Sequence, residues 1–214
     1  MIFDRSCAHE WVHRLLPILE VALGYKKALP VRQLTSMKEF VEKFPFVKKV
    51  ILDGTERPVQ RPQDNEKQKE YYSGKKKRHT SKHITGSTNE KRIIYLSKAR
   101  RGKIHDKKQL DEENLVEYIP DDVAIEGDLG FKGLEKEYEN VYLPHKKPKG
   151  KELSALQKIQ NRELSRERVK CEHAHGGIKR YNCVTAVYRN RVPDFDDRLM
   201  LNYTGLWNFY LDAA

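Results

Sequence analysis

Three carboxylic acids occupy positions in this sequence where an acid is costly unless it has a partner. Asp53 directly follows the apolar run Val50–Leu52, Asp128 ends the predicted strand 121–128, and Glu172 lies in a long helical pattern. An ionised carboxylate at the end of a core strand is destabilising unless it is paired or binds a metal ion. For Asp53 alone, an Asp-Gly turn that closes a hairpin is the simpler interpretation. The two further acids make a metal site worth considering.

Basic residues accompany Glu172 on one face of its helix. At 100° per residue, the side chains within roughly 60° of arc are those of Ser165, Arg168, Glu172 and Lys179. An isolated i,i+4 Arg–Glu pair is usually a solvated ion pair worth a few tenths of a kcal/mol. Three carboxylates, however, suit a pair of hard divalent cations in phosphoryl chemistry, and nearby Lys and Arg side chains stabilise the developing charge.

The charge of the chain is arranged in blocks. The formal net charge of the whole chain is +11; residues 56–108 hold 17 Lys or Arg against 6 Asp or Glu, residues 109–144 hold 2 against 11, and residues 145–180 hold 11 against 4. Such clustering fits a surface that binds a polyanion, most commonly nucleic acid. A solvated lysine-rich surface is the alternative interpretation.

Length and composition exclude several classes of protein. A chain of 214 residues is long enough for one domain, or for one domain with a small appendage. No run approaches the roughly 18 apolar residues of a membrane span, and charges interrupt any signal-peptide pattern, so we expect a cytoplasmic protein without a membrane partner. Cys7, Cys171 and Cys183 form no Cys-x-x-Cys pair, which argues against a disulfide scaffold and a structural zinc site.

The hydrophobic pattern predicts a mixed α/β fold. The predicted helices are 6–24, 36–44, 106–115 and a long one within 151–181, and Pro17 predicts a kink in the first of them or a junction between two shorter helices. The predicted strands are 47–53, 78–86, 91–99, 121–128 and 139–146. The second and third strands should pair antiparallel. A C-terminal tail follows the long helix, and Trp207, Phe209 and Tyr210 in it are expected to serve packing.

Other residues also invite a functional interpretation. Lys75, Lys76, Lys77 and Arg78 follow two tyrosines and form a basic patch beside aromatics, which is either a nucleic-acid contact or a solvated surface; the family resemblance given below favours contact. Asp106, after His105, is more simply a helix cap than a metal ligand. His173 and His175 are two residues apart on a helix, so they point to different faces and should not share a metal.

Six stretches, taken together and in order, resemble the DDE insertion-sequence transposases of the Harbinger-related branch, a group also described as DDE superfamily endonucleases. The stretches run from about residue 50 to the C-terminus and read "LDGTERPVQRP", "YYSGKKKRHTSK", "GKIHDKK", "GDLGFKGL", "LPHKKPKGKELS" and "NRELSRERVKCEHAHGGIKRYNCVTAVYRNR". The helix signature of such transposases matches here at Arg168, Glu172 and Lys179, whereas Ser165 occupies its tyrosine position.

The resemblance implies a ribonuclease H-like mixed sheet flanked by helices, with Asp53, Asp128 and Glu172 as the catalytic and metal-binding triad. It implies two Mg²⁺ ions, with Mn²⁺ as a substitute: Asp53 and Asp128 would hold one, and Asp53 and Glu172 the other. The implied activity is metal-dependent cleavage of double-stranded DNA at transposon ends, followed by strand transfer into target DNA. The residues expected at the DNA are Lys75, Lys76, Lys77, Arg78, Arg168 and Lys179.

The resemblance also assigns the segments of the chain. Residues 1–27 would be a helical remnant of a helix-turn-helix DNA-binding region, 28–45 a linker with a short helix, and 46–214 the DDE catalytic domain. The chain would then be an N-terminally truncated transposase that forms a homodimer on DNA. A catalytically silent DNA-binding remnant, or a domesticated regulator, is the alternative.

Overall fold

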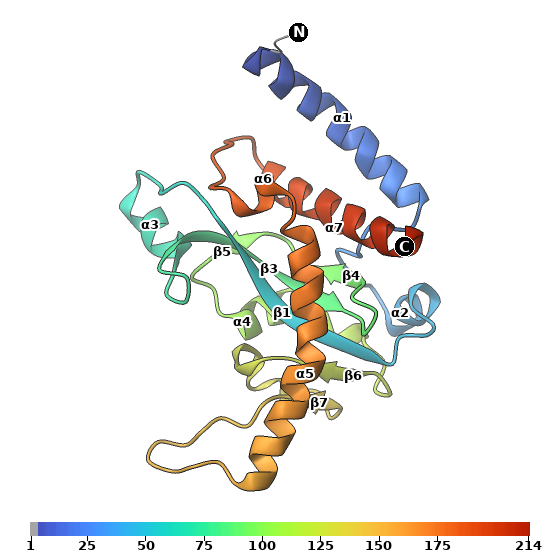
Figure 1. Cartoon of the computed structure of the whole chain (residues 1–214), viewed down its shortest axis with the longest axis vertical. Coiled ribbons are helices and arrows are strands. Elements are labelled where there is room, and N and C mark those ends of the chain that lie inside the picture. Colours follow the sequence, from blue (N-terminus) through green and yellow to red (C-terminus); the bar gives the residue numbers. More distant parts are fainter. Residues whose placement is uncertain (1–3) are drawn as a thin grey trace.

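The computed structural model describes residues 4–214 and contains a mixed sheet with helices on both faces (Figure 1). The α-helices are α1 (Arg5–Tyr25), α2 (Met37–Lys43), α3 (Asn65–Tyr71), α4 (Asp106–Glu112), α5 (Ala155–Ile178), α6 (Asn182–Thr185) and α7 (Phe195–Ala213). Three 3₁₀ turns are η1 (Val116–Tyr118), η2 (Leu129–Phe131) and η3 (Leu134–Lys136). The strands are β1 (Lys49–Pro58), β2 (Tyr72–Ser73), β3 (Arg78–Ser87), β4 (Ile93–Leu96), β5 (Arg100–Arg101), β6 (Ala124–Glu126) and β7 (Val141–Tyr142).

The sheet is built around β1. Strand β3 pairs with β1 antiparallel, whereas β6 pairs with β1 parallel, and the order is β2-β3-β1-β6-β7 with β4 and β5 also paired to β3. The antiparallel pair β3 and β4 confirms the hairpin predicted from the sequence. The parallel strands β6 and β7 then extend the sheet on the other side of β1. The prediction of a mixed α/β fold is confirmed.

Two apolar clusters cover the two faces of this sheet. One packs side chains of β1, β3 and β6 against α4 and η2 and includes Leu52, Ile84, Leu110, Ile125 and Phe131. The other packs α5 and α7 against β4 and includes Ile93, Leu96, Ala174, Ile178 and Trp207. Helix α5 therefore crosses the face of the sheet opposite to α4 (Figure 1). A Ser154–Gln157 capping box fixes its beginning.

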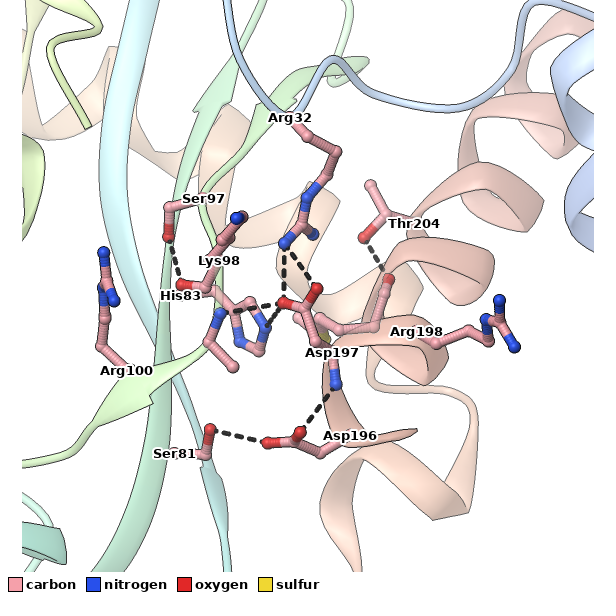
Figure 2. Close-up of polar contacts among 12 residues, drawn as sticks. Arg32, Ser81, His83, Ser97, Lys98, Arg100, Asp196, Asp197, Arg198 and Thr204 are labelled. Atoms are coloured by element: carbon pink, nitrogen blue, oxygen red, sulfur yellow. Dashed lines mark hydrogen bonds and ion pairs between the residues drawn. The ribbon is translucent and has the colours of Figure 1, made fainter. Parts of the chain in front are cut away.

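The expectation of a C-terminal tail is wrong, because residues 195–213 form the helix α7. Its first turn is tied to the sheet through Asp197, which accepts hydrogen bonds from Arg32 and from the backbone N–H of Ala99 and lies 3.3 Å from Nε2 of His83 (Figure 2). The neighbouring Asp196 accepts a hydrogen bond from Ser81. Contacts from distant segments thus hold α7, which explains why local sequence patterns did not indicate it.

Helix α1 confirms the helix predicted near the N-terminus and packs against α7 (Figure 1). It continues through Pro17, where a kink or a junction was expected. Within α7, Trp207 is buried as expected, but Phe209 and Tyr210 are largely exposed. Across the described residues 4–214, no helix is both long enough and apolar enough to span a membrane.

Candidate active site

Asp53 lies within a strand and faces α5. Strand β1 continues for five residues beyond Asp53 to Pro58, so the interpretation of an Asp-Gly turn is wrong. Asp53 is paired with Thr85 of β3, and directly opposed residues of an antiparallel pair share one face of the sheet. That face meets α5, because the Thr85 hydroxyl lies 2.7 Å from Nε2 of His175. The Asp53 side chain is 14% exposed, so little solvent reaches it.

Asp128 follows β6 at the level of Asp53. The parallel register pairs Ile51 with Glu126, and continuing it for two residues brings Asp128 beside Asp53. Asp128 then begins η2, where its Oδ1 accepts a hydrogen bond from the backbone N–H of Gly130 at 2.7 Å. The sheet therefore brings together the two aspartates that the sequence analysis singled out.

Positive charges lie next to both aspartates. A guanidinium nitrogen of Arg168 is 3.7 Å from Oδ1 of Asp53, and Nζ of Lys75 is 3.9 Å from Oδ2 of Asp128. Burial raises the pKa of Asp53, the charge of Arg168 lowers it, and the charge of Asp128 raises it again. Asp53 and Asp128 are thus two largely buried carboxylates that lie close together, each next to a basic side chain. Such a site can bind a cation or a phosphate.

Lys179 belongs to the same neighbourhood. It caps the C-terminal end of α5, so Gly176 and Gly177 do not break the helix before it. Burial of its ammonium group and the charge of Lys76 lower the pKa of Lys179, whereas the charge of Asp53 opposes this shift. Two predicted DNA-binding residues, Lys76 and Lys179, are therefore close enough to interact electrostatically.

Glu172 is placed differently from the aspartates. It is exposed on α5, next to the buried Cys171, and within residues 4–214 it forms no hydrogen bond or ion pair. The residues of α5 that turn to Asp53 are Arg168, Cys171 and His175, whose spacing of three and four positions keeps them on one face. The role of Glu172 as third acid stays a prediction.

Sequence reasoning missed Cys171 and His175 as neighbours of Asp53. His175 Nδ1 lies 3.6 Å from Oδ2 of Asp53, and Cys171 Sγ lies 3.9 Å from Nε2 of His175. Burial lowers the pKa of His175 to about 3, and the charges of Lys179 and Arg168 act in the same direction. Burial, followed by the charge of Asp53, raises the pKa of Cys171 to about 12. The i,i+4 spacing of Cys171 and His175 was the available signal.

Asp106 is not a helix cap. Helix α4 begins at Asp106 with His105 as its N-cap residue, and no side chain caps this end. The Asp106 carboxylate instead accepts a hydrogen bond from Nζ of the buried Lys82 at 2.8 Å. It also lies against Gly54 and Gly130, so it is a further acid close to Asp128.

A second basic surface is formed by segments far apart in the sequence. A cleft of about 1360 Å³ lies between α3, β5 and the segment 188–194. Its cationic lining residues are Arg61, Lys67, Arg100, Arg101, Lys103, Lys108, Arg189 and Arg191, and its acidic ones are Asp64, Glu70, Asp194 and Asp196. We call it the basic cleft. None of the three predicted acids lines it, and none of the residues Lys75–Arg78 does.

Comparison with known proteins identifies relatives of the chain. Residues 52–208 match the family described as DDE superfamily endonuclease. The chain is 34% identical over 163 residues to a protein of Microchaete diplosiphon described as "Probable transposase for insertion sequence element IS702". The alignment covers 76% of this chain and 57% of that relative, so the chain spans little more than half of the relative's length. No solved structure matches significantly.

Proposed function

The chain belongs to the DDE superfamily endonucleases, and on that premise we propose that it is a transposase catalytic domain that cleaves and transfers DNA strands with divalent metal ions. The observation that carries the proposal is the placement of Asp128, two residues after the end of β6, beside Asp53 on the parallel strand β1, with Arg168 and Lys75 next to them. Glu172 is the proposed third acid.

We propose that the sheet is of the ribonuclease H-like kind. The strands β4, β3 and β1 are antiparallel neighbours, and β6 and β7 continue the sheet parallel to β1. In such a sheet, an acid on β1 and an acid just after the adjacent β6 lie close together, and α5 crosses the sheet at β1. This topology supports the proposal, because it gives a reason for both aspartates to lie where they do.

The residues present fit a hard divalent cation. Asp53 and Asp128 offer carboxylate oxygens, which Mg²⁺ and Mn²⁺ prefer, and the charge of Asp128 raises the pKa of Asp53 because two like charges are close. We propose that Asp53 and Asp128 hold one ion and that Asp53 and Glu172 hold the second. When bound, such ions activate the attacking oxygen and stabilise the leaving oxygen of a phosphodiester.

The bases would hold the DNA in the site. Arg168 and Lys75 already reach the two aspartates, so a phosphate between the carboxylates would be within their range. Lys76, Lys77, Arg78 and Lys179 would continue this contact along the duplex. We further propose that the basic cleft carries the backbone of a second stretch of DNA, because its cationic residues outnumber its acidic ones.

The proposed reaction has two steps. In the first, water attacks a phosphorus atom at the transposon end, the P–O3′ bond breaks, and a free 3′-OH and a 5′-phosphate remain. In the second, that 3′-OH attacks a phosphodiester of the target DNA, so one P–O bond forms as another breaks and no external energy source is needed. Arg168 would stabilise the negative charge that develops on the phosphate oxygens. A homodimer on double-stranded DNA would pair the two ends.

The proposal is tested by strand cleavage in an Asp128→Ala variant. We expect the wild-type chain with Mg²⁺ or Mn²⁺ to cut a plasmid that carries its own element's ends, and the variant to cut no more than a protein-free control. The matched control is Asp122→Ala, which removes the same charge at an exposed carboxylate paired with Lys48. Non-specific DNA affinity should be the same in both variants, and a loss of affinity in Asp128→Ala would contradict a catalytic role.

The alternative, a silent DNA-binding remnant or a regulator, predicts a different result from the same assay. Its wild-type chain would bind DNA with strong salt dependence and cut nothing with either metal. The exposed position of Glu172 is the observation that favours it. Cleavage that depends on Asp128 would exclude it.

A further inference from the structure

Three side chains with different donor atoms converge where α5 crosses β1. They are Asp53 from the strand and Cys171 and His175 from the helix, and their ligand atoms all lie within 4.8 Å of one another. Cys171 and His175 are buried, and their i,i+4 spacing places both on the face of α5 that meets the sheet. Among the described residues, no other group of three His, Cys, Asp or Glu side chains meets this criterion.

The hydrogen bonds leave one oxygen of Asp53 directed at this group. Its Oδ1 accepts a hydrogen bond from the backbone N–H of Gly54 at 2.9 Å and lies 3.7 Å from the Arg168 guanidinium. Its Oδ2 instead faces Nδ1 of His175 at 3.6 Å. The two oxygens therefore have different surroundings: one is paired with donors, and the other points to the imidazole.

The contacts of His175 are compatible with a lone pair on the ring nitrogen that faces that oxygen. The Thr85 hydroxyl donates to the backbone carbonyl of Asp53 at 3.2 Å and lies 2.7 Å from Nε2 of His175, so it accepts from Nε2 in the tautomer that carries its proton there. A neutral imidazole with its proton on Nε2 has a lone pair on Nδ1. Two acceptors, Nδ1 and Oδ2, then face each other, and a cation between them satisfies both.

We propose that Asp53, Cys171 and His175 form a binding site for Zn²⁺ or a similar borderline-soft cation. A thiolate, an imidazole and a carboxylate are the ligand types that Zn²⁺ takes, whereas Mg²⁺ takes oxygen ligands. Cys171 binds as the thiolate, so its proton is released to solvent on binding. The fourth ligand is a water molecule or the substrate, as in zinc sites with three protein ligands.

This site has a consequence for the proposed strand cleavage, and that consequence rests on the proposed function. Asp53 is shared, so Zn²⁺ held by Cys171 and His175 withdraws Asp53 from the pair with Asp128. Zinc is then an inhibitor that competes with Mg²⁺ for Asp53, and Mg²⁺ displaces it only at high concentration because Mg²⁺ gains little from a thiolate or an imidazole. Metal binding itself needs neither DNA nor cleavage, so a failure of this inference and a failure of the proposed function are separable.

The test is a titration of the full reduced chain with Zn²⁺ in competition with a chromophoric chelator. We expect one Zn²⁺ per chain, with binding weakened at least about tenfold in Cys171→Ser and in His175→Gln. Even the mutation of a residue that only supports a metal ligand typically lowers the metal affinity by about 10–100-fold. The matched control is Cys183→Ser, a half-buried free thiol on α6, and it should bind like the wild type. Because the two sites share Asp53, excess Mg²⁺ should weaken the apparent Zn²⁺ affinity by the same factor by which Zn²⁺ weakens Mg²⁺ binding.

Co²⁺ in place of Zn²⁺ identifies the sulfur ligand directly. A thiolate-to-Co²⁺ absorption band in the near ultraviolet is expected for the wild type and for Cys183→Ser, and its absence is expected for Cys171→Ser. The near-ultraviolet circular dichroism of the metal-free variants checks that they are folded. If Cys171→Ser does not fold, the Zn²⁺ titration of His175→Gln alone tests the site. The inference is overturned if wild type and His175→Gln bind Zn²⁺ equally, or if the band survives in Cys171→Ser.

Discussion

Asp128 and Asp106 both approach the backbone of a single glycine, Gly130. A Cβ added at Gly130 would lie 2.5 Å from Oδ2 of Asp106 and 2.7 Å from Oδ1 of Asp128, both far below van der Waals contact. Its backbone N–H also donates to Asp128. Residue 130 must therefore be a glycine, because two carboxylates approach its backbone and leave no space for a Cβ. This reason does not involve a left-handed backbone conformation.

Replacing Gly130 by alanine should therefore displace the carboxylates. We expect Gly130→Ala to lower the free energy of unfolding by about 1–3 kcal/mol, as is typical of overpacking, and to lower the rate of metal-dependent cleavage. Chemical denaturation and the plasmid assay measure the two effects. Gly24→Ala on α1 is the matched control, because its Cβ would lie 3.8 Å from the nearest side-chain atom, Leu29 Cδ1, an ordinary contact. Unchanged cleavage by Gly130→Ala would contradict the placement of Asp128 in the site.

At the scale of the elements, α5 connects the site to the core. Its middle turns present Arg168, Cys171 and His175 to β1, and its last turns pack Ile178 and Gly177 against α7. Sequence periodicity predicted this helix and the hairpin β3–β4, because their patterns are local. It missed α7, whose first turn depends on Arg32 and His83 from distant parts of the chain.

The same distinction between local and long-range signals applies to the candidate site. Asp53 and Asp128 could be singled out from the sequence, because each stands at the end of a predicted strand, and the parallel register of β1 and β6 brings these two positions together. The group of Asp53, Cys171 and His175 could not, because a Cys–His pair four residues apart on a helix is common and does not by itself indicate a third ligand. The third ligand comes from a strand more than 100 residues away in the chain, and only the packing of α5 on β1 joins them.

Two adjacent glycines test the packing of α5 on α7. A Cβ at Gly177 would lie 2.1–2.4 Å from the indole ring of Trp207, whereas a Cβ at Gly176 meets nothing within 4 Å. Gly177→Ala should therefore lower the free energy of unfolding by about 1–3 kcal/mol. Gly176→Ala should raise it by about 0.5–1 kcal/mol, through helix propensity and a less flexible unfolded chain. Denaturant unfolding of both variants measures this, and equal effects would argue against the described packing.

At the scale of the whole molecule, two regions hold clusters of charged side chains, the site of the two aspartates and the basic cleft. The two aspartates lie beside Lys75 and Arg168, and the basic cleft adds cationic residues from segments around 61–67, 100–108 and 189–191. The sequence indicated the first basic block by its run of lysines. The cleft could not be recognised from a run, because folding is what brings its arginines together.

Salt dependence tests the block at Lys75–Lys77. Replacing these three lysines by glutamine should flatten the slope of log K against log salt by up to about 2.7, or about 0.9 for each DNA phosphate that is no longer neutralised. Fluorescence anisotropy with labelled duplex DNA measures the slope. The control replaces three exposed lysines of the loop before α5, Lys146, Lys149 and Lys151, by glutamine. If both triple variants flatten the slope equally, net charge and not the position of the block determines binding.

The anchor of α7 makes stability depend on pH. Burial lowers the pKa of His83 from its usual 6.5, although Asp197 opposes this, so folded His83 stays neutral where the unfolded chain takes up a proton. Burial would raise the pKa of Asp197, but His83 and Arg32 hold this pKa well below its usual 3.8. The stability that ionised Asp197 contributes is therefore lost only at lower pH than that of His83. The stability contributed by His83 is therefore complete above about pH 6.5 and falls as the pH drops below it.

A glutamine at position 83 should remove that dependence. His83→Gln keeps a donor for Asp197, so we expect the slope of unfolding free energy against pH, between about pH 4.5 and 6.5, to decrease by up to about 1.4 kcal/mol per pH unit. Denaturant melts across this range measure the slope. Ser81→Ala, which removes only the hydrogen bond to Asp196, should lower stability without changing the slope. An unchanged slope in His83→Gln would show that His83 titrates alike in both states.

The central claim is that Asp53 and Asp128 form a metal site, and one measurement tests it most directly. Anomalous scattering from a crystal soaked in Mn²⁺ requires neither cognate DNA nor turnover. We predict a manganese peak bounded by the carboxylates of Asp53 and Asp128, with Glu172 turned towards it. An ordered crystal with no manganese at Asp128, or with manganese only at Cys171 and His175, would contradict the account.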